Sequence, residues 1–157
     1  MEVQRQQEHR WLERLVGEWT SEMEAAMKPG DPPETFTGTE SVRSLDGLWV
    51  LCEGQPSGGA STTIMTLGYD TAKGRYVGTF IGSMSTYMWV YEGTVDAGGN
   101  ALTLETEGPS FADESRMAKY RDTIEFRGDD HRVLSSTMQG EDGGWQQVME
   151  VHYRRTQ

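Results

Sequence analysis

The sequence predicts an all-β protein, an antiparallel up-and-down barrel of about ten strands with one short N-terminal helix capping one end. Polar and apolar residues alternate with a period of two from about residue 18 onward, which is the pattern of half-buried strands. Turn sequences rich in glycine and aspartate interrupt this alternation at regular spacing. The 157 residues are enough for one packed core, so we expect residues 1–157 to form a single domain, with a helix at 5–16 and a barrel at 17–155.

The helix is predicted at the start of the chain. Four apolar side chains there have the i, i+1, i+4, i+5 spacing of one helix face: Trp11, Leu12, Leu15 and Val16. Gly17 follows directly and is a typical helix stop.

The strands follow the helix in unbroken succession. The alternating segments are 18–27, 35–44, 48–54, 61–69, 75–82, 87–95, 101–107, 119–127, 131–139 and 145–154. The clearest turn signals between them are LDG at 45–47, YDTAKG at 69–74, DAGGN at 96–100, GDD at 128–130 and EDGG at 141–144.

The loop lengths predict two different ends of the barrel. Successive antiparallel strands place the compact turns near residues 46, 72, 98 and 129 at one end, together with the helix. Longer loops rich in proline and glycine, such as 28–34, 55–60 and 108–118, belong to the other end. We therefore expect a closed floor and an open mouth, in a barrel with room for one small ligand. An open sandwich of two five-stranded sheets is the structural alternative.

Charge and composition argue against two classes of partner. Asp and Glu total 25 against 14 Lys and Arg, giving a formal net charge of -11, so we expect no nucleic acid and no membrane surface as partner. The chain has no apolar run of about 18 residues. Its start, MEVQRQQEHR, lacks the pattern of a secretory signal, and Cys52 is the single cysteine, so we expect a cytoplasmic protein.

No sequence motif points to catalysis. His9, His131 and His152 have no metal-ligand spacing, and the chain contains no C-x-x-C, G-x-S-x-G or phosphate-binding loop. We therefore expect no metal site and no catalytic residues, although an enzyme of unknown reaction that uses the mouth loops stays a third alternative.

Several segments resemble known families. Gly17-Glu18-Trp19, between the helix and the first strand, resembles the G-x-W signature of lipocalin-like barrels. The run TLGYDTAKGRYVGTFIGSMSTYMWVYEGT at 66–94, LTL at 102–104 and MEVHYRR at 149–155 resemble the bacterial family called domain of unknown function 1579. The resemblance implies a lipocalin-like (calycin-type) barrel from a bacterium, and it implies no particular activity.

The chain also resembles nitrobindin-type ten-stranded barrels in architecture, and those proteins bind haem through a histidine on a late strand. His152 lies on the last predicted strand, but the glycine-rich segment of those proteins is replaced here by TSEMEAAM at 20–27. In addition, Met149, Val151 and Tyr153 form the apolar face of that strand, so His152 points the other way. We therefore expect no haem and a surface position for His152.

The apolar faces of the strands supply the candidate ligand-binding residues. These are Trp19, Met23, Phe36, Met65, Phe80 and Met149, alongside other apolar residues on the same faces: Val42, Leu67, Tyr76, Leu102, Leu104 and Val151. They are either a filled core or the lining of a pocket, and nine methionines favour an adaptable pocket. The first predicted function is therefore non-enzymatic binding of a small hydrophobic or amphipathic molecule in the barrel, as a carrier or sensor.

Charged residues inside the strand-like runs are candidates for the polar part of such a pocket. They are Glu53, Glu92, Arg121 and Glu150, and the last three match polar positions of the family pattern. We predict that Arg121 pairs with one of these carboxylates inside the barrel and that Glu92 and Arg121 contact the ligand, because a buried charge needs a partner. A surface ion pair between neighbouring strands is the alternative for each.

One segment is apolar on both faces. In GSMSTYMWVYEG at 82–93, Tyr87, Trp89 and Tyr91 share one face of a strand, and Met88 and Val90 share the other. One face must then lie outside the barrel, which predicts a homodimer or a docking site through the outer face of strand 87–95. This is the second predicted function, an assembly module with a packed barrel; alternatively the helix covers the outer face.

Overall fold

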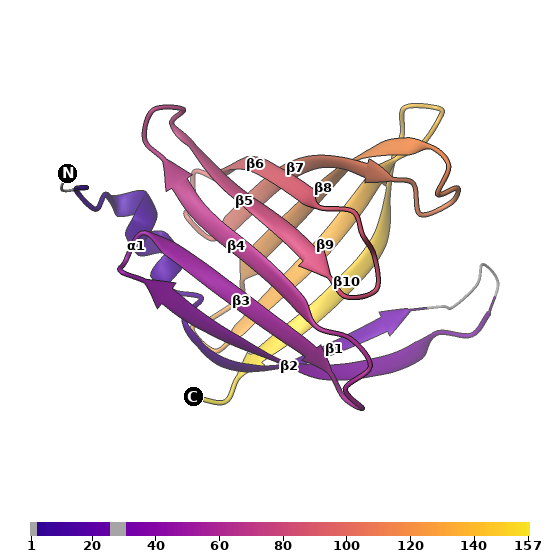
Figure 1. The fold of residues 1–157 in the computed structure, drawn as a ribbon, viewed down its shortest axis with the longest axis horizontal. Coiled ribbons are helices and arrows are strands. Elements are labelled where there is room, and N and C mark those ends of the chain that lie inside the picture. The colour runs from indigo at the N-terminus through magenta and orange to yellow at the C-terminus, as the bar shows by residue number, and fades with distance from the viewer. Residues whose placement is uncertain (1–2, 26–30) are drawn as a thin grey trace.

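The computed structural model describes residues 3–25 and 31–157. Within them the chain forms one helix and ten strands (Figure 1). In chain order these are α1 (Gln7–Glu13), β1 (Gly17–Ala25), β2 (Glu34–Leu45), β3 (Trp49–Pro56), β4 (Thr63–Asp70), β5 (Arg75–Gly82), β6 (Trp89–Val95), β7 (Ala101–Pro109), β8 (Met117–Phe126), β9 (His131–Gln139) and β10 (Trp145–Arg155).

The strands form a closed antiparallel barrel in up-and-down order. Each strand pairs with its neighbours in sequence, and β1 pairs with β10 to close the sheet. The closing ladder extends from Trp19 opposite Arg155 to Met23 opposite Val151. The predicted fold class is confirmed, and the open sandwich is excluded because closure leaves no free sheet edge along this ladder.

The inward faces agree with the alternation in the sequence. Leu67, Leu102 and Leu104 have no solvent exposure, and the register places Cys52, Met65 and Phe80 side by side on the inner surface of three neighbouring strands. The apolar residues expected inside all face the interior of the barrel, which we call the lumen. Period-two patterning therefore predicts the strands and the inward face of those that are apolar on one side, whereas the inward face of strands 48–54 and 87–95, apolar on both sides, comes from the structure.

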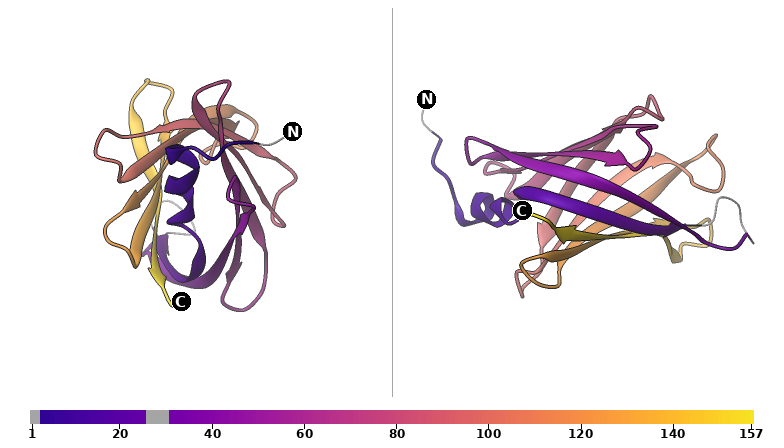
Figure 2. Two further views of the ribbon diagram at one scale, coloured as in Figure 1. Left: turned by 90° about the vertical axis from the view of Figure 1, so that its left-hand side faces the viewer. Right: turned by 90° about the horizontal axis from the view of Figure 1, so that it is seen from below.

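The helix closes one end of the barrel, as expected (Figure 2, left). The side chains of Leu12, in the helix, and Leu15, just after it, are buried in the core. Trp11 Nε1 donates a hydrogen bond to the carbonyl oxygen of Gly99 over 2.7 Å. Tyr76 donates its hydroxyl to the carbonyl oxygen of Glu8 over 3.2 Å. The helix thus contacts the compact turns that the sequence assigned to a closed floor.

The last residues of β10 fasten the helix to the floor. Arg155 Nη1 and Nη2 donate to the carbonyl oxygens of Val16 and Arg14 over 2.6 and 2.8 Å. The same guanidinium group lies 4.2 Å from the ring of Trp19. Carbonyl groups beyond the helix end are thereby satisfied by a cation, the charge that this end favours.

Several predicted boundaries differ from the structure. The helix is shorter than 5–16. After Glu13 the chain forms a tighter turn, in which the backbone N–H groups of Leu15 and Val16 donate to the carbonyl oxygens three residues earlier over 3.0 and 3.1 Å. Gly17 has a φ of 140° and begins β1. Strand 87–95 begins only at Trp89, and the end of strand 18–27 at 26–27 lies outside the described residues.

The barrel widens toward its other end, where two ladders stop early (Figures 1 and 2). The β1–β10 ladder ends at Met23 opposite Val151, and the β6–β7 ladder ends at Glu92 opposite Glu105. The strands separate beyond these pairs, so this end is the predicted mouth. In the described part of the chain, no helix has the length and apolar character needed to cross a membrane.

Candidate functional site

The lumen contains two adjoining spaces. An inner cavity of about 40 Å³ lies deep in the barrel, and a wider recess of about 160 Å³ lies at the mouth, where its lining extends to the outward positions Thr39 and Gln55. Glu40, Thr63 and Tyr153 line both spaces, so the recess leads to the inner cavity. The apolar wall of the recess includes Met23, Phe36 and Val151.

A buried ion pair lies where the two spaces meet. Arg132 on β9 is 3% exposed, and its Nη2 donates to Glu40 Oε1 on β2. The guanidinium group lies 4.0 Å from the Tyr153 ring and 4.5 Å from the Trp19 ring. Stacking on two aromatic rings and pairing with a carboxylate offset the desolvation of the arginine.

The pair is incompletely hydrogen-bonded. Arg132 Nε is shielded from solvent and has no hydrogen-bond partner within the described residues. A buried N–H without an acceptor costs free energy, so this donor is available to a ligand or a water molecule in the inner cavity.

Two further groups beside this pair are chemically inert. Burial raises the pKa of the Cys52 thiol, and the negative charge of Glu40 raises this pKa further. Burial likewise raises the pKa of Tyr153, again with a contribution from Glu40. Both groups are therefore neutral at physiological pH, and Cys52 lacks the thiolate that a nucleophile requires.

A second polar cluster lies on the wall formed by β6 to β9. Tyr91 donates its hydroxyl to Asp122 Oδ2 over 2.6 Å. Burial raises the pKa of Asp122, while hydrogen bonds from Ser136 and Tyr91 oppose this effect. Thr106, on the adjacent strand, is 9% exposed, and its hydroxyl has no partner among the residues that the structure describes.

The predicted apolar site residues fall into three groups. Met23 and Phe36 line the recess, and Met65 and Phe80 line the inner cavity. Met149 pairs with inward-facing Ser136 but lines neither space; it lines the separate groove where β1 and β10 part. Trp19 is buried under Arg132 at the floor, where its Nε1 donates to the Leu15 carbonyl over 2.9 Å, and it lines neither space.

The predicted internal pair involving Arg121 is wrong. Arg121 Nε lies 3.7 Å from Glu105 Oε1 on the outer face of the barrel, and its guanidinium group is 4.0 Å from the Trp145 ring. Glu92 is also outside, 3.2 Å from the ammonium group of Lys73. Arg121 directly follows inward-facing Tyr120, so strand alternation directs it outward.

Sequence reasoning missed the charged residues that do face the lumen. Glu40 shares the strand face of Phe36 and Val42, and Asp122 shares that of Ile124. Strict alternation would have identified both positions. The family pattern instead favoured Glu92 and Arg121, which lie on the outer face.

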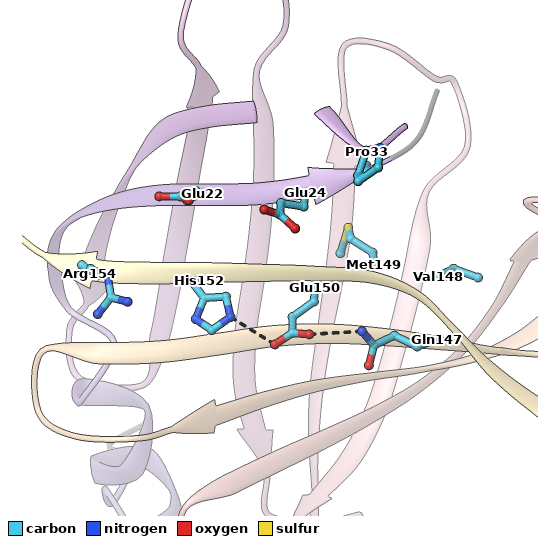
Figure 3. Close-up of a pocket in the computed structure, with 10 residues that line it drawn as sticks. Glu22, Glu24, Pro33, Gln147, Val148, Met149, Glu150, His152 and Arg154 are labelled. Carbon is cyan, nitrogen blue, oxygen red and sulfur yellow. Dashed lines mark hydrogen bonds and ion pairs between the residues drawn. The ribbon is translucent and has the colours of Figure 1, made fainter. Parts of the chain in front are cut away.

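A separate groove of about 670 Å³ follows the outside of the β1–β10 separation (Figure 3). His152 lies there, as alternation predicted, with Nε2 3.1 Å from Glu150 Oε1 and Nδ1 2.9 Å from His131 Nε2. Gln147 donates to the other oxygen of Glu150 over 3.2 Å. Among the described residues, no group of three His, Cys, Asp or Glu side chains is arranged to hold a metal ion.

The outer face of β3 to β6 carries a group of exposed apolar side chains bordered by Glu53 and Glu92, and we call this apolar group the outer wall. Its exposed members include Val90, Met88, Ile81 and Trp49, at 58%, 54%, 44% and 41%. The helix lies across the floor and leaves this wall uncovered (Figure 2). Trp89 and Tyr91 of the same segment face the lumen, which explains why the segment is apolar on both faces.

Solved structures share this fold at low sequence identity. The M. tuberculosis protein Rv2717c is 13% identical with a TM-score of 0.67, and the match covers 98% of this chain and 100% of that chain. The S-type phycobiliprotein lyase CPES from Guillardia theta is 18% identical with a TM-score of 0.56, covering 94% of this chain and 92% of that chain. No curated protein matches the sequence.

The family comparison covers almost the whole barrel. A family model described as "Protein of unknown function (DUF1579)" matches residues 4–155, from the segment before α1 to the last residue of β10. The resemblance found in the sequence is therefore confirmed, and the chain belongs to the DUF1579 family.

Proposed function

We propose that this protein binds a small amphipathic molecule in the mouth half of its lumen, as a non-enzymatic carrier or sensor. The observation that supports this most strongly is the recess of about 160 Å³, which has an apolar wall and leads to a buried ion pair with an unpartnered N–H donor. An apolar wall with a few oriented polar groups is the usual composition of a ligand pocket.

The size of the recess limits the ligand. A cavity of about 150 Å³ is large enough for benzene, whereas pockets for larger ligands occupy roughly 300–1,000 Å³. The recess therefore suits a molecule built on one ring or a short chain. Met23 and Met65 have flexible side chains, so a rotamer change can enlarge the space for a longer guest.

The similar CPES structure is an S-type phycobiliprotein lyase, so the same fold also serves a lyase. That likeness is one of fold, and the proposal rests on the recess itself. The neutral state of Cys52 supports a binding role over nucleophilic catalysis. A cytoplasmic location, expected from the single cysteine, belongs to the same proposal.

A blocking variant tests the proposal. The probe is benzyl alcohol, a neutral one-ring molecule, titrated into the protein and followed by amide chemical-shift changes in NMR spectra. We expect saturable binding that is lost in Met23→Trp, which fills the recess, and retained in Met88→Trp, on the outer wall. Binding that survives Met23→Trp unchanged, or that disappears only in Met88→Trp, would place the ligand outside the lumen.

The outer wall supports a second candidate function, self-association. The exposed side chains of Val90, Ile81 and Trp49 form an apolar strip bordered by Glu53 and Glu92, and such a strip can pack against a second copy with the carboxylates at the rim of the interface. We expect sedimentation to give a dimer mass at micromolar concentration and a monomer for Val90→Lys. Thr94→Lys, further along β6, is the matched control that stays dimeric. A monomeric wild-type protein would exclude this candidate.

A further inference from the structure

A carboxyl group without a cationic partner faces the lumen from β8. Asp122 lies on the same strand face as the buried residues Tyr120 and Ile124. Glu40 is neutralised by Arg132, but Asp122 takes part in no ion pair within the described chain. The lumen therefore contains one negative charge that the protein itself leaves uncompensated.

The hydrogen bonding around Asp122 is also incomplete. Tyr91 donates to Oδ2 and the Ser136 hydroxyl, on the paired strand, also interacts with this carboxyl group, whereas Oδ1 is shielded from solvent and has no assigned hydrogen-bond partner in the part of the chain that is described. The Thr106 hydroxyl is equally shielded and unpartnered. Thr106 pairs with Tyr120 and Leu104 pairs with Asp122, so Thr106 and Asp122 are diagonal neighbours on the inner face. Two oxygens on neighbouring strands of the inner face thus lack a hydrogen-bond partner among the described residues.

The position of Asp122 is compatible with ligand contact. Ile124 and Leu134 pair with each other and line the inner cavity. Asp122 pairs with Ser136 one step nearer the mouth, because β8 begins at the mouth with Met117. The carboxyl group therefore faces the mouth half of the lumen, from a different part of the wall than the recess, whose lining comes from β1 to β4 and β10.

The missing partner must donate hydrogen bonds and offset a negative charge. A water molecule can donate to both oxygens but leaves the charge uncompensated. A protonated amine has three donors and a positive charge. Aromatic rings beside this cluster, Trp89 and Tyr120 with centroids 5.0 Å apart, favour a cation further.

We propose that the ligand of the lumen carries a protonated amine, which donates hydrogen bonds to Asp122 Oδ1 and Thr106 Oγ1. This inference rests on the proposed function, because it assigns the chemical class of the same ligand. The net charge of -11 also favours the approach of a cation over that of an anion.

Three probes of the same size test the assignment: benzylamine, benzyl alcohol and benzoate, which are cationic, neutral and anionic at pH 7. Dissociation constants are measured by NMR titration under identical salt conditions. We expect benzylamine to bind at least about tenfold more tightly than benzyl alcohol, as one charge-assisted contact allows, and benzoate to bind most weakly.

Variants assign the preference to Asp122. Asp122→Asn keeps the shape of the side chain and removes its charge, so we expect the ratio between benzylamine and benzyl alcohol to fall to about one. Thr106→Val is a milder second variant that removes one acceptor and lowers the ratio in part. Glu105→Gln, an exposed carboxylate on β7, is the matched control and leaves the ratio unchanged.

The outcomes separate this inference from the function on which it rests. If benzyl alcohol binds and benzylamine binds no better, the lumen site stands and the amine assignment fails. If the amine preference persists in Asp122→Asn, another carboxylate binds the amine and the assignment also fails. If none of the three probes binds in the lumen, the proposed function fails together with the inference.

Discussion

The floor and the mouth of this barrel differ in almost every physical respect. At the floor, Leu12, Leu15 and Trp19 are at most 1% exposed, and Arg155 joins the end of β10 to the helix. At the mouth, Phe36 and Phe80 are only half-buried and two strand ladders stop early. The chain therefore concentrates its packing at one end and leaves usable space at the other.

This difference shows how one small barrel can combine stability with binding. Burial of large apolar side chains is the main favourable contribution to folding, and the floor supplies it. Space and unpartnered polar groups reduce stability, and the recess together with three of the four shielded, unpartnered polar atoms of the described residues lies in the mouth half or where it meets the floor; the fourth, Arg75 Nε, lies on β5 at the floor end. Substitutions in the two halves should accordingly separate effects on unfolding from effects on ligand binding.

The largest expected effect belongs to the ion pair at the boundary between the two halves. Arg132→Met leaves the Glu40 carboxylate without its cation, so we expect the free energy of unfolding to fall by about 3–5 kcal/mol. Urea unfolding followed by circular dichroism measures this change. The double variant with Glu40→Gln removes both charges and should regain most of the loss. A loss under about 1 kcal/mol in Arg132→Met would show that the pair contributes little.

Truncating a side chain should cost more stability at the floor than at the mouth. Leu12→Ala opens a cavity in the floor and should cost about 2–5 kcal/mol. Met23→Ala removes a half-buried side chain at the mouth and should cost about 1 kcal/mol or less, because less apolar surface is lost from the core. Equal losses in urea unfolding would mean that the mouth is packed as firmly as the floor.

Substitution of Asp122 should increase the free energy of unfolding, whereas the substitutions above decrease it. Because burial raises the pKa of Asp122, the folded protein holds this proton more tightly than the unfolded chain. The ionised carboxyl therefore reduces stability as pH rises above its unfolded pKa of about 3.9. We expect Asp122→Asn to increase the free energy of unfolding at pH 7 by about 1 kcal/mol, and the gain to vanish at acidic pH. A loss of stability at pH 7 would indicate that a cation compensates Asp122 in the free protein.

The smallest expected effect lies on the outer surface. Arg121 and Glu105 form an exposed pair, with side chains 47% and 59% exposed. Arg121→Gln should change the free energy of unfolding by less than about 1 kcal/mol and leave benzyl alcohol binding unchanged. A marked loss of benzyl alcohol binding in this variant would show that Arg121 takes part in ligand binding.

The fold was accessible from the sequence because its signals are local. Alternation located the ten strands, and loop composition distinguished floor from mouth. The polar site was less accessible, because Arg132 reaches Glu40 across β10 and β1, a contact that no short-range pattern records. Arg121 and Glu92 were misplaced because they were chosen by family pattern, against the alternation of their own strands.

The methionines of this chain allow the most direct test of binding in the lumen. Met23 lines the recess and Met65 the inner cavity, whereas Met88 is exposed on the outer wall, at 54%. Methyl NMR spectra of protein labelled at its methionines would be recorded during titration with benzylamine and benzyl alcohol. The account predicts saturable shifts for the two lumen methyl groups and an unchanged signal for Met88. Shifts confined to Met88 would contradict it, because the small molecule would then bind the surface while the barrel stayed closed to it.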